Sequence, residues 1–175
     1  MPEGWSKVRE LAKLADMHAH FELEIPVGDL PGIPEEFSLA EGPVRAVLRF
    51  GREQGRAVAH VTLNAVLTPV CQRCLGAMRM PVAADSRLAL LESEAQAADV
   101  PEEYESFLAP DGQCTLSALV AEELLLALPI VPRHGAGEPC GAGEAVEVRP
   151  AARSGATETQ RPFAGLRALL ERAKS

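Results

Sequence analysis

The sequence predicts an α+β protein in which a Leu-rich helix packs on a strongly twisted, mostly antiparallel sheet. Three observations support this class. Apolar and polar residues alternate along several segments between Phe21 and Leu90, which is the period of half-buried strands. Apolar residues from Leu116 to Leu128 instead recur at helical spacing. A Gly-containing stretch then precedes a short amphipathic C-terminal segment. The pattern does not decide whether the sheet is partly closed into a barrel.

The N-terminal part is expected to form a helix and then a strand. From Ser6 to Met17, apolar residues return every three or four positions, as on an amphipathic helix. From Phe21 to Val27 the apolar positions alternate instead, which indicates a strand.

Two hairpins are expected next. Strands are predicted from Val44 to Phe50 and from Val61 to Leu67, joined by a five-residue turn from Gly51 to Gly55. Alternation resumes from Met78 to Leu90, so the turn containing Cys71 and Cys74 should cap a second hairpin of the same sheet. The sheet would then hold at least these strands in sequential antiparallel order.

The second half of the chain contains less sheet. Residues 92–101 are expected to be helical or irregular, and Tyr104 to Leu108 a short edge strand. Thr115 or Ser117 can cap the Leu-rich helix, which Pro129 and Pro132 prevent from continuing. The predicted organisation is one α+β domain over 1–134, a flexible linker over 135–160 and an amphipathic helix over 161–175.

Composition excludes some function classes. The 175 residues carry a net charge of −8, and no apolar run is long enough to cross a bilayer. The segment from Asp85 to Glu123 contains ten acidic residues and one basic residue, Arg87, so its net charge is −9. An acidic body disfavours broad coating of nucleic acid and favours a protein partner or one localised RNA contact. Without an apolar leader, a cytoplasmic location is expected, with no membrane partner.

The Cys-x-x-Cys turn at Cys71 and Cys74 carries the main chemical signal. Such a turn can be half of a metal site, a redox pair, a disulfide or a plain structural turn. Zinc needs four N or S donors, and His134 with Cys140 is the reasonable second pair. Cys114 is a substitute donor, although packing as a small apolar group suits it better. A redox pair would need a helix N-terminus beside it, whereas strands are predicted on both sides.

No other sequence motif indicates a particular enzymatic reaction. The sequence has no phosphate-binding Gly-x-x-x-x-Gly-Lys loop, and the glycines after Gly135 do not join a strand to a helix. Spacing also reveals no Ser-His-Asp or paired-carboxylate site. A catalytic role or a small-molecule substrate is therefore not expected.

Three blocks in order resemble the YceD family, the large ribosomal RNA subunit accumulation proteins of bacteria and plastids. They are the Cys-Gln-Arg-Cys-Leu turn at 71–75, the segments Val100–Glu105 and Leu116–His134 with their Leu-Ala-Leu-Pro-Ile-Val-Pro core, and Pro162-Phe163-Ala164 with two later leucines. The resemblance implies a non-catalytic factor for synthesis, processing or stability of large-subunit (23S) ribosomal RNA. Some relatives carry extra cysteines after the Leu-Pro block and look like zinc proteins. This chain lacks a second Cys-x-x-Cys, so the resemblance alone leaves zinc open.

The expected mechanism is binding, to large-subunit ribosomal RNA or to pre-ribosomal proteins. The candidate RNA or partner contacts are Arg73, Arg161, Phe163, Arg167, Arg172 and Lys174. The acidic segment from Asp99 to Asp111 is a candidate protein contact. Two alternatives remain: a thiol-disulfide oxidoreductase that uses Cys71 and Cys74, and a zinc-stabilised protein adaptor unconnected with ribosomes.

Overall fold

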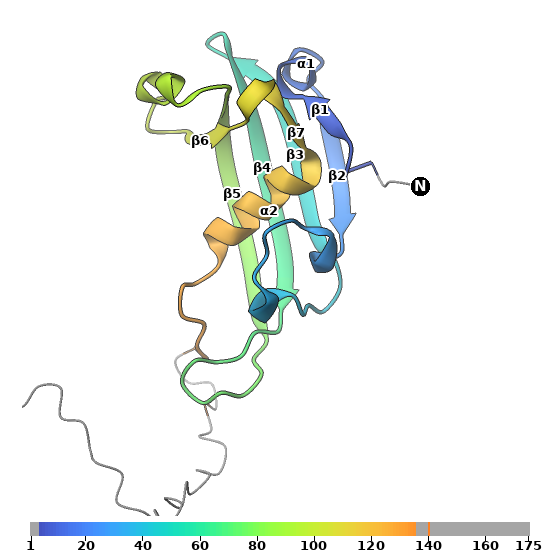
Figure 1. Cartoon of the computed structure of the whole chain (residues 1–175), viewed down its shortest axis with the longest axis vertical. Coiled ribbons are helices and arrows are strands. Elements are labelled where there is room, and N and C mark those ends of the chain that lie inside the picture. Colours follow the sequence, from blue (N-terminus) through green and yellow to red (C-terminus); the bar gives the residue numbers. More distant parts are fainter. Residues whose placement is uncertain (1–3, 136–139, 141–175) are drawn as a thin grey trace, which may run out of the picture. The chain divides into compact units, whose positions relative to one another are not determined.

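A computed structural model describes residues 4–135 and 140. These residues form an α+β fold around a five-stranded sheet with strand order β2-β3-β4-β5-β6 (Figure 1). The strands are β2 (His20–Ile25), β3 (Val44–Glu53), β4 (Arg56–Leu67), β5 (Met80–Leu91) and β6 (Glu105–Leu108). The first four pair antiparallel and β6 pairs parallel with β5. The predicted class and the mostly antiparallel sheet are confirmed.

The sheet is open, so barrel closure is wrong for this chain. Among the described strands, β2 pairs only with β3 and β6 pairs only with β5. Each is therefore an edge of the sheet. Closure would require hydrogen bonds between β2 and β6, and these two edge strands, of six and four residues, do not pair with each other.

The turn between β3 and β4 is tighter than the sequence predicted. Glu53 pairs with Arg56, so two residues make the turn instead of five. Gln54 and Gly55 both have positive φ, 52° and 79°, as in the two-residue turns that match the twist of a hairpin. Strand pairing therefore continues past Phe50 to Glu53, although Gly51 suggested that the strand ends there.

The N-terminal helix is shorter than predicted, because its first turn is a strand. β1 (Val8–Glu10) pairs antiparallel with β7 (Gln113–Thr115), and α1 (Leu11–Asp16) follows directly. Leu11, Leu14 and Ala15 of α1 are buried in the core. The helical spacing thus identified the core-facing residues, but a three-residue strand with a distant partner leaves no sequence period of its own.

Helix α2 (Leu116–Ala127) lies across one face of the sheet, over β4 and β5 (Figure 1). The Thr115 hydroxyl accepts a hydrogen bond from the Ala118 N–H at 3.1 Å, which confirms the predicted cap. Leu116, Leu119, Val120 and Leu124 are fully buried against the strands. The core lies between this helix and the sheet, so the helix determines which strand residues face inwards.

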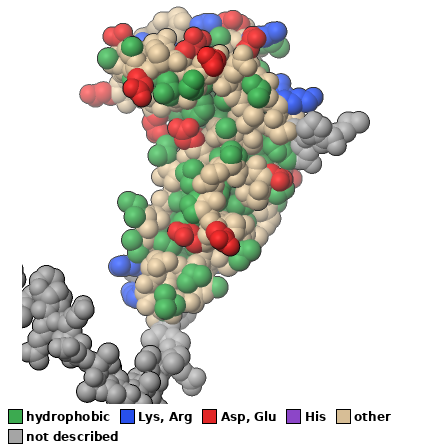
Figure 2. Space-filling view, in the orientation of Figure 1, with side chains coloured by type: hydrophobic (Ala, Val, Ile, Leu, Met, Phe, Trp, Pro, Cys, Tyr) green, Lys and Arg blue, Asp and Glu red, His purple; other side chains and the backbone are tan. Residues whose placement is uncertain are grey.

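The loop between β2 and β3 completes the same layer. It contains the short 3-10 helices η1 (Val27–Asp29) and η2 (Glu35–Phe37), and Val27, Leu30 and Phe37 are buried in the core. Two further 3-10 helices, η3 (Glu94–Asp99) and η4 (Pro110–Gly112), lie in the acidic segment. Figure 2 shows carboxylates gathered at that end of the α2-bearing face.

The opposite face of the sheet has no described helix across it. Its strand positions are mostly polar and at least partly exposed, including Arg45, Arg49, His60 and Thr62. Among the described residues, Tyr104 and Val100 cover its β6 end, where they pack on Val58, Ala89 and Leu91. This surface is called the open face below.

Within residues 4–135 and 140, no helix is both long and apolar enough to cross a bilayer. The linker and C-terminal helix predicted over 135–160 and 161–175 lie outside the described residues, apart from Gly135 and Cys140.

Candidate metal centre

The Cys71 to Cys74 turn joins β4 to β5, at one end of the sheet. The Cys71 N–H donates to the Gly76 carbonyl at 2.9 Å, and the Leu75 N–H donates to the Cys71 carbonyl at 2.8 Å. Leu75 has a left-handed backbone with φ of 58°. These bonds fold the segment into a compact loop, which places both thiols of the pair on its inner side.

The loop is tied to the segment that leaves α2. The Gln72 N–H donates to the Pro132 carbonyl at 2.9 Å. Pro129 and Pro132 end the helix and keep the following residues extended, so His134 comes to lie beside the cysteines. This one backbone bond therefore joins the two halves of the site, which are about sixty residues apart in sequence.

Cys71, Cys74, His134 and Cys140 form one cluster. One ligand atom from each residue, three sulfurs and one ring nitrogen, lies within 4.8 Å of all the others. The Cys71 and Cys140 sulfurs are 3.9 Å apart, and Cys74 Sγ is 3.6 Å from His134 Nδ1. The structure thus brings together the four residues that the sequence predicted as one metal site.

The spacing suits a tetrahedral ion. Zinc bonds of about 2.3 Å to sulfur and about 2.0 Å to nitrogen place tetrahedral ligands about 3.8 Å apart for two sulfurs and about 3.5 Å apart for sulfur and nitrogen. The two distances above agree with these values to about 0.1 Å. Three thiolates and one imidazole also form a common structural zinc set. The residues present could therefore hold a metal ion.

The surroundings of Cys71 favour its thiolate. Its side chain is buried, with an exposed fraction of 0%, and burial opposes ionisation. Backbone hydrogen bonds from Cys74, Arg73 and His134 outweigh that cost, and the pKa of the Cys71 thiol is lowered to about 5. A metal ligand needs this ionised form.

Cys74 behaves differently. The Gly76 N–H lowers the pKa of the Cys74 thiol, but burial and the neighbouring Cys140 and Cys71 sulfurs raise it more, so its pKa lies above the ordinary value. Several thiolates at this distance repel one another without a cation between them. The cluster as a whole therefore favours binding of a positive ion.

Arg73 points its side chain to the cluster. Its Nε–H donates to Cys140 Sγ at 2.9 Å, and the contact raises the pKa of Arg73. The sequence placed this residue as an RNA contact, which stays a prediction. Its hydrogen bond to a metal-ligand candidate is the feature that sequence reasoning missed; only its position between the two cysteines hinted at it.

The other candidate donor lies elsewhere. Cys114 is in β7, where it pairs with Arg9 of β1, and it is not among the four clustered residues. Burial, and then the nearby Glu122 carboxylate, raise the pKa of the Cys114 thiol to about 11. Cys114 is thus a neutral packing residue, as the sequence favoured.

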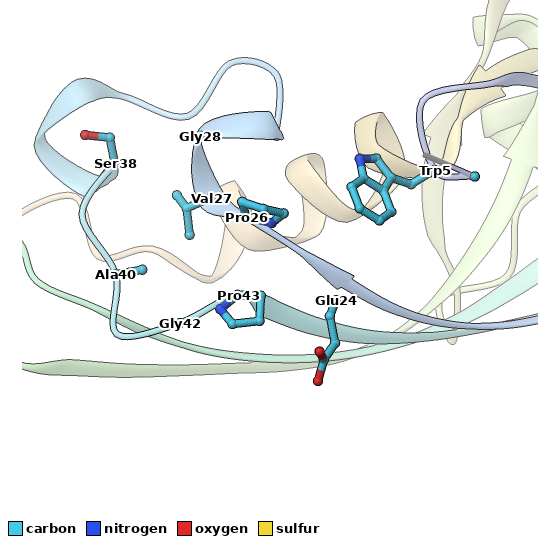
Figure 3. Close-up of a pocket in the computed structure, with 10 residues that line it drawn as sticks. Trp5, Glu24, Pro26, Val27, Gly28, Ser38, Ala40, Gly42 and Pro43 are labelled. Atoms are coloured by element: carbon cyan, nitrogen blue, oxygen red, sulfur yellow. The ribbon is translucent and has the colours of Figure 1, made fainter. Parts of the chain in front are cut away.

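A hollow of about 850 Å³ lies away from the cluster, at the edge beyond β2 (Figure 3). Trp5 from the N-terminal segment, Pro26 and Val27 from the end of β2, and Pro43 line it. Its polar side chains, Glu24 and Ser38, lie on opposite sides of the hollow in Figure 3 and do not converge on one point. We assign no chemistry to it.

The comparisons with known proteins agree with the resemblance. The family model YceD, described as large ribosomal RNA subunit accumulation protein YceD, matches residues 59–170. The match spans β4, the cysteine turn, β5 and α2. It includes all four residues of the cluster. No solved structure matches the chain.

Proposed function

This chain belongs to the YceD family, and we propose that it is a non-catalytic cytoplasmic factor that supports the synthesis, processing or stability of large-subunit (23S) ribosomal RNA. The family match over residues 59–170 is the observation that carries the proposal. The binding partner would be the RNA itself or a protein already on the pre-ribosomal particle. The absence of a predicted reaction motif in the sequence is consistent with a binding role.

Depletion in the organism that encodes the chain tests this function. Loss of the protein should lower 23S relative to 16S ribosomal RNA, and the tagged protein should sediment with large-subunit precursors in a sucrose gradient. A reporter RNA of similar length serves as the control for general RNA decay. Normal 23S levels, with the protein remaining at the top of the gradient, would exclude the ribosomal role and leave the adaptor alternative.

We further propose that the metal at the four-residue cluster is zinc. The donor set and the two distances of 3.9 and 3.6 Å support this ion. When bound, zinc would hold the Cys71 turn and the segment around His134 together. Its role would be structural, because the chain offers four protein ligands and a catalytic site keeps one position open.

Metal analysis of the purified protein tests the zinc proposal. About one zinc per chain is expected in the wild type, and Cys71→Ser or Cys140→Ser should lose most of it. Cys114→Ser is a matched control, because it removes a thiol outside the cluster and should keep the metal. Wild-type protein purified without chelator and found free of zinc would refute the proposal.

The lowered pKa of Cys71 also favours the oxidoreductase alternative, because a thiolate is the attacking species in disulfide exchange. Its complete burial argues against access by a substrate disulfide. Reduction of insulin by the protein, abolished by Cys71→Ser, would support a redox enzyme. Activity no greater than that of Cys71→Ser would support the binding role.

A further inference from the structure

Four residues form a straight row across the open face. His20 of β2 pairs with Arg49 of β3, Arg49 pairs with His60 of β4, and His60 pairs with Arg87 of β5. Residues that pair directly across antiparallel strands share a face, and neighbouring strands are about 4.8 Å apart. The row therefore places four side chains that are, or can become, cationic along about 14 Å. We call it the basic row.

Arg49 differs from Arg87 and His60 of the row, each of which lies beside a carboxylate. Arg87 donates to Glu53 at 2.7 Å, and His60 is 2.7 Å from an Asp85 oxygen. Arg45, on the same strand and face as Arg49, donates to Glu24 at 3.0 Å. No acid partner of Arg49 is found among the residues that the structure describes. Arg56, at the hairpin end of this face, also lacks a described carboxylate partner, but it donates to the Asp99 carbonyl at 2.8 Å. The exposed Arg49 guanidinium is therefore left to bind an external anion.

A small hollow lies beside this guanidinium. It measures about 160 Å³ and is lined by Arg49, His60, Arg87 and Tyr104, and also by the Glu53 carboxylate, which is paired with Arg87. This volume is large enough to admit a small anionic group and several water molecules. Tyr104 donates its hydroxyl proton to Glu53, and Arg87 lies 4.8 Å from the centre of its ring. These contacts fix Arg87 at the wall of the hollow.

We propose that the basic row binds the phosphate backbone of RNA, with one phosphodiester at the hollow beside Arg49. Arg and His side chains on a sheet without a covering helix can contact consecutive phosphates of a single strand. The inference rests on the proposed function for its partner, and it adds the site: a local contact on the open face of an otherwise acidic protein. It also explains how a chain of net charge −8 could engage RNA without broad coating.

Binding of a short fluorescein-labelled uridine homopolymer to the full chain, followed by anisotropy over a range of salt concentrations, tests the site. Arg49→Gln should weaken binding several-fold and make the slope of log K against log salt shallower by about 0.7 to 1, the loss of one phosphate contact. Arg49→Lys should restore most of the slope, because it keeps the charge. Arg45→Gln, the same change of charge on the same strand and face, should leave the slope close to that of the wild type.

An unchanged slope in Arg49→Gln, or an equal loss in Arg45→Gln, would overturn the basic row as the RNA site. Sedimentation distinguishes this outcome from failure of the proposed function. If the wild type and Arg49→Gln both sediment with large-subunit precursors and bind the homopolymer equally, the row is wrong and the ribosomal role stands. If the wild type stays at the top of the gradient while the homopolymer slope still depends on Arg49, the row binds RNA but the ribosomal role fails.

Discussion

Glu123 places a carboxyl group on the buried side of α2. Its exposed fraction is 2%, whereas the adjacent Glu122 is exposed to solvent. Burial raises the pKa of Glu123; a hydrogen bond with Ser86 partly opposes the shift, and the nearby Glu105 and Glu122 carboxylates add to it. The folded protein therefore prefers the protonated acid more strongly than the unfolded chain does.

This preference predicts how stability depends on pH. Because the folded pKa lies above the unfolded one, the contribution of Glu123 is complete below the unfolded value and is lost as pH rises through the folded value. Glu123→Gln keeps a partner for Ser86 and cannot ionise. Its unfolding free energy relative to the wild type should rise by on the order of 1 kcal/mol between about pH 5 and about pH 8.

Urea denaturation at several pH values measures this difference. Glu122→Gln is a comparison rather than a neutral control, because burial also raises the pKa of Glu122 and its carboxylate adds to the shift of Glu123. It should change the pH dependence in the same direction but by less, since Glu122 is exposed. A Glu123→Gln curve parallel to that of the wild type would mean that Glu123 has no shifted pKa.

Arg73 is expected to increase the affinity of the four-residue cluster for zinc. Zinc with three thiolates and a neutral imidazole has a net charge of −1, and the Arg73 guanidinium lies beside one of the sulfurs. Partners that hydrogen-bond to metal ligands commonly contribute about 10-fold to 100-fold in affinity. Arg73→Gln should therefore weaken zinc binding about 10-fold in competition with a chromophoric chelator.

Arg79 provides the control for this substitution. It follows the same turn and donates to Glu41 at 2.9 Å, away from the sulfurs. Arg79→Gln should leave zinc affinity unchanged. Equal affinities in Arg73→Gln and the wild type would show that the contact with Cys140 does not stabilise the bound metal.

At the scale of the elements, the metal is expected to fasten one end of the fold and not the whole of it. The core between α2 and the sheet is built mostly from apolar residues that belong to no metal-ligand set, such as Leu48, Leu63 and Leu119, and only its margin includes the cysteines of the cluster. Removing the metal should therefore leave the sheet folded. It should loosen the Cys71 turn from the segment around Pro132, since without the metal their described backbone hydrogen bonds are those of the Gln72 N–H to the Pro132 carbonyl and of the His134 N–H to Cys71.

Hydrogen exchange with and without a zinc chelator tests this local effect. Amides of residues 70–78 and 130–135 should lose protection, while those of β3 and β4 should keep it. A chelator-induced loss of protection throughout the sheet would mean that the metal is required for the entire domain, as in zinc fingers.

The cap of α2 gives a second test at this scale. Thr115 ends β7 and its hydroxyl satisfies the Ala118 N–H, so one side chain joins the small sheet to the helix. Thr115→Ala should lower the unfolding free energy by about 1 kcal/mol, measured by urea denaturation. Thr115→Ser should restore it, and a failure to do so would assign the loss to packing of the methyl group.

Alternation predicted β2 to β5 because each of these strands buries one face, and a buried face imposes a period of two. β1 and β7 could not be predicted, since three residues carry no period and their pairing connects Arg9 with Cys114, far apart in sequence. The parallel pairing of β6 with β5 could not be predicted from the sequence pattern either. In the metal centre, residue type and spacing identified the donors, but their distances depend on how α2 ends.

Across the whole molecule, charge is distributed unevenly. The segment from Asp85 to Glu123 carries −9, whereas residues 161–175 carry four bases and one acid, which gives +3. The negatively charged phosphates of RNA repel the acidic segment and attract the basic C-terminal residues. If both the basic row and the terminal segment contact RNA, the acidic residues outside the row, such as Glu94 and Asp111, would remain available for a protein partner.

Two charge-matched variants separate a local terminal contact from a general effect of net charge. Arg172 and Lys174 replaced by Gln should make the salt slope of RNA binding shallower by about 1.4, if each base contacts one phosphate of a single strand. Lys7 and Lys13 replaced by Gln change the net charge equally and should leave the slope nearly unchanged. Equal slopes for both variants would mean that the terminal bases act only through total charge. Combining the terminal change with Arg49→Gln should sum the two slope changes, because separate phosphates release separate counterions.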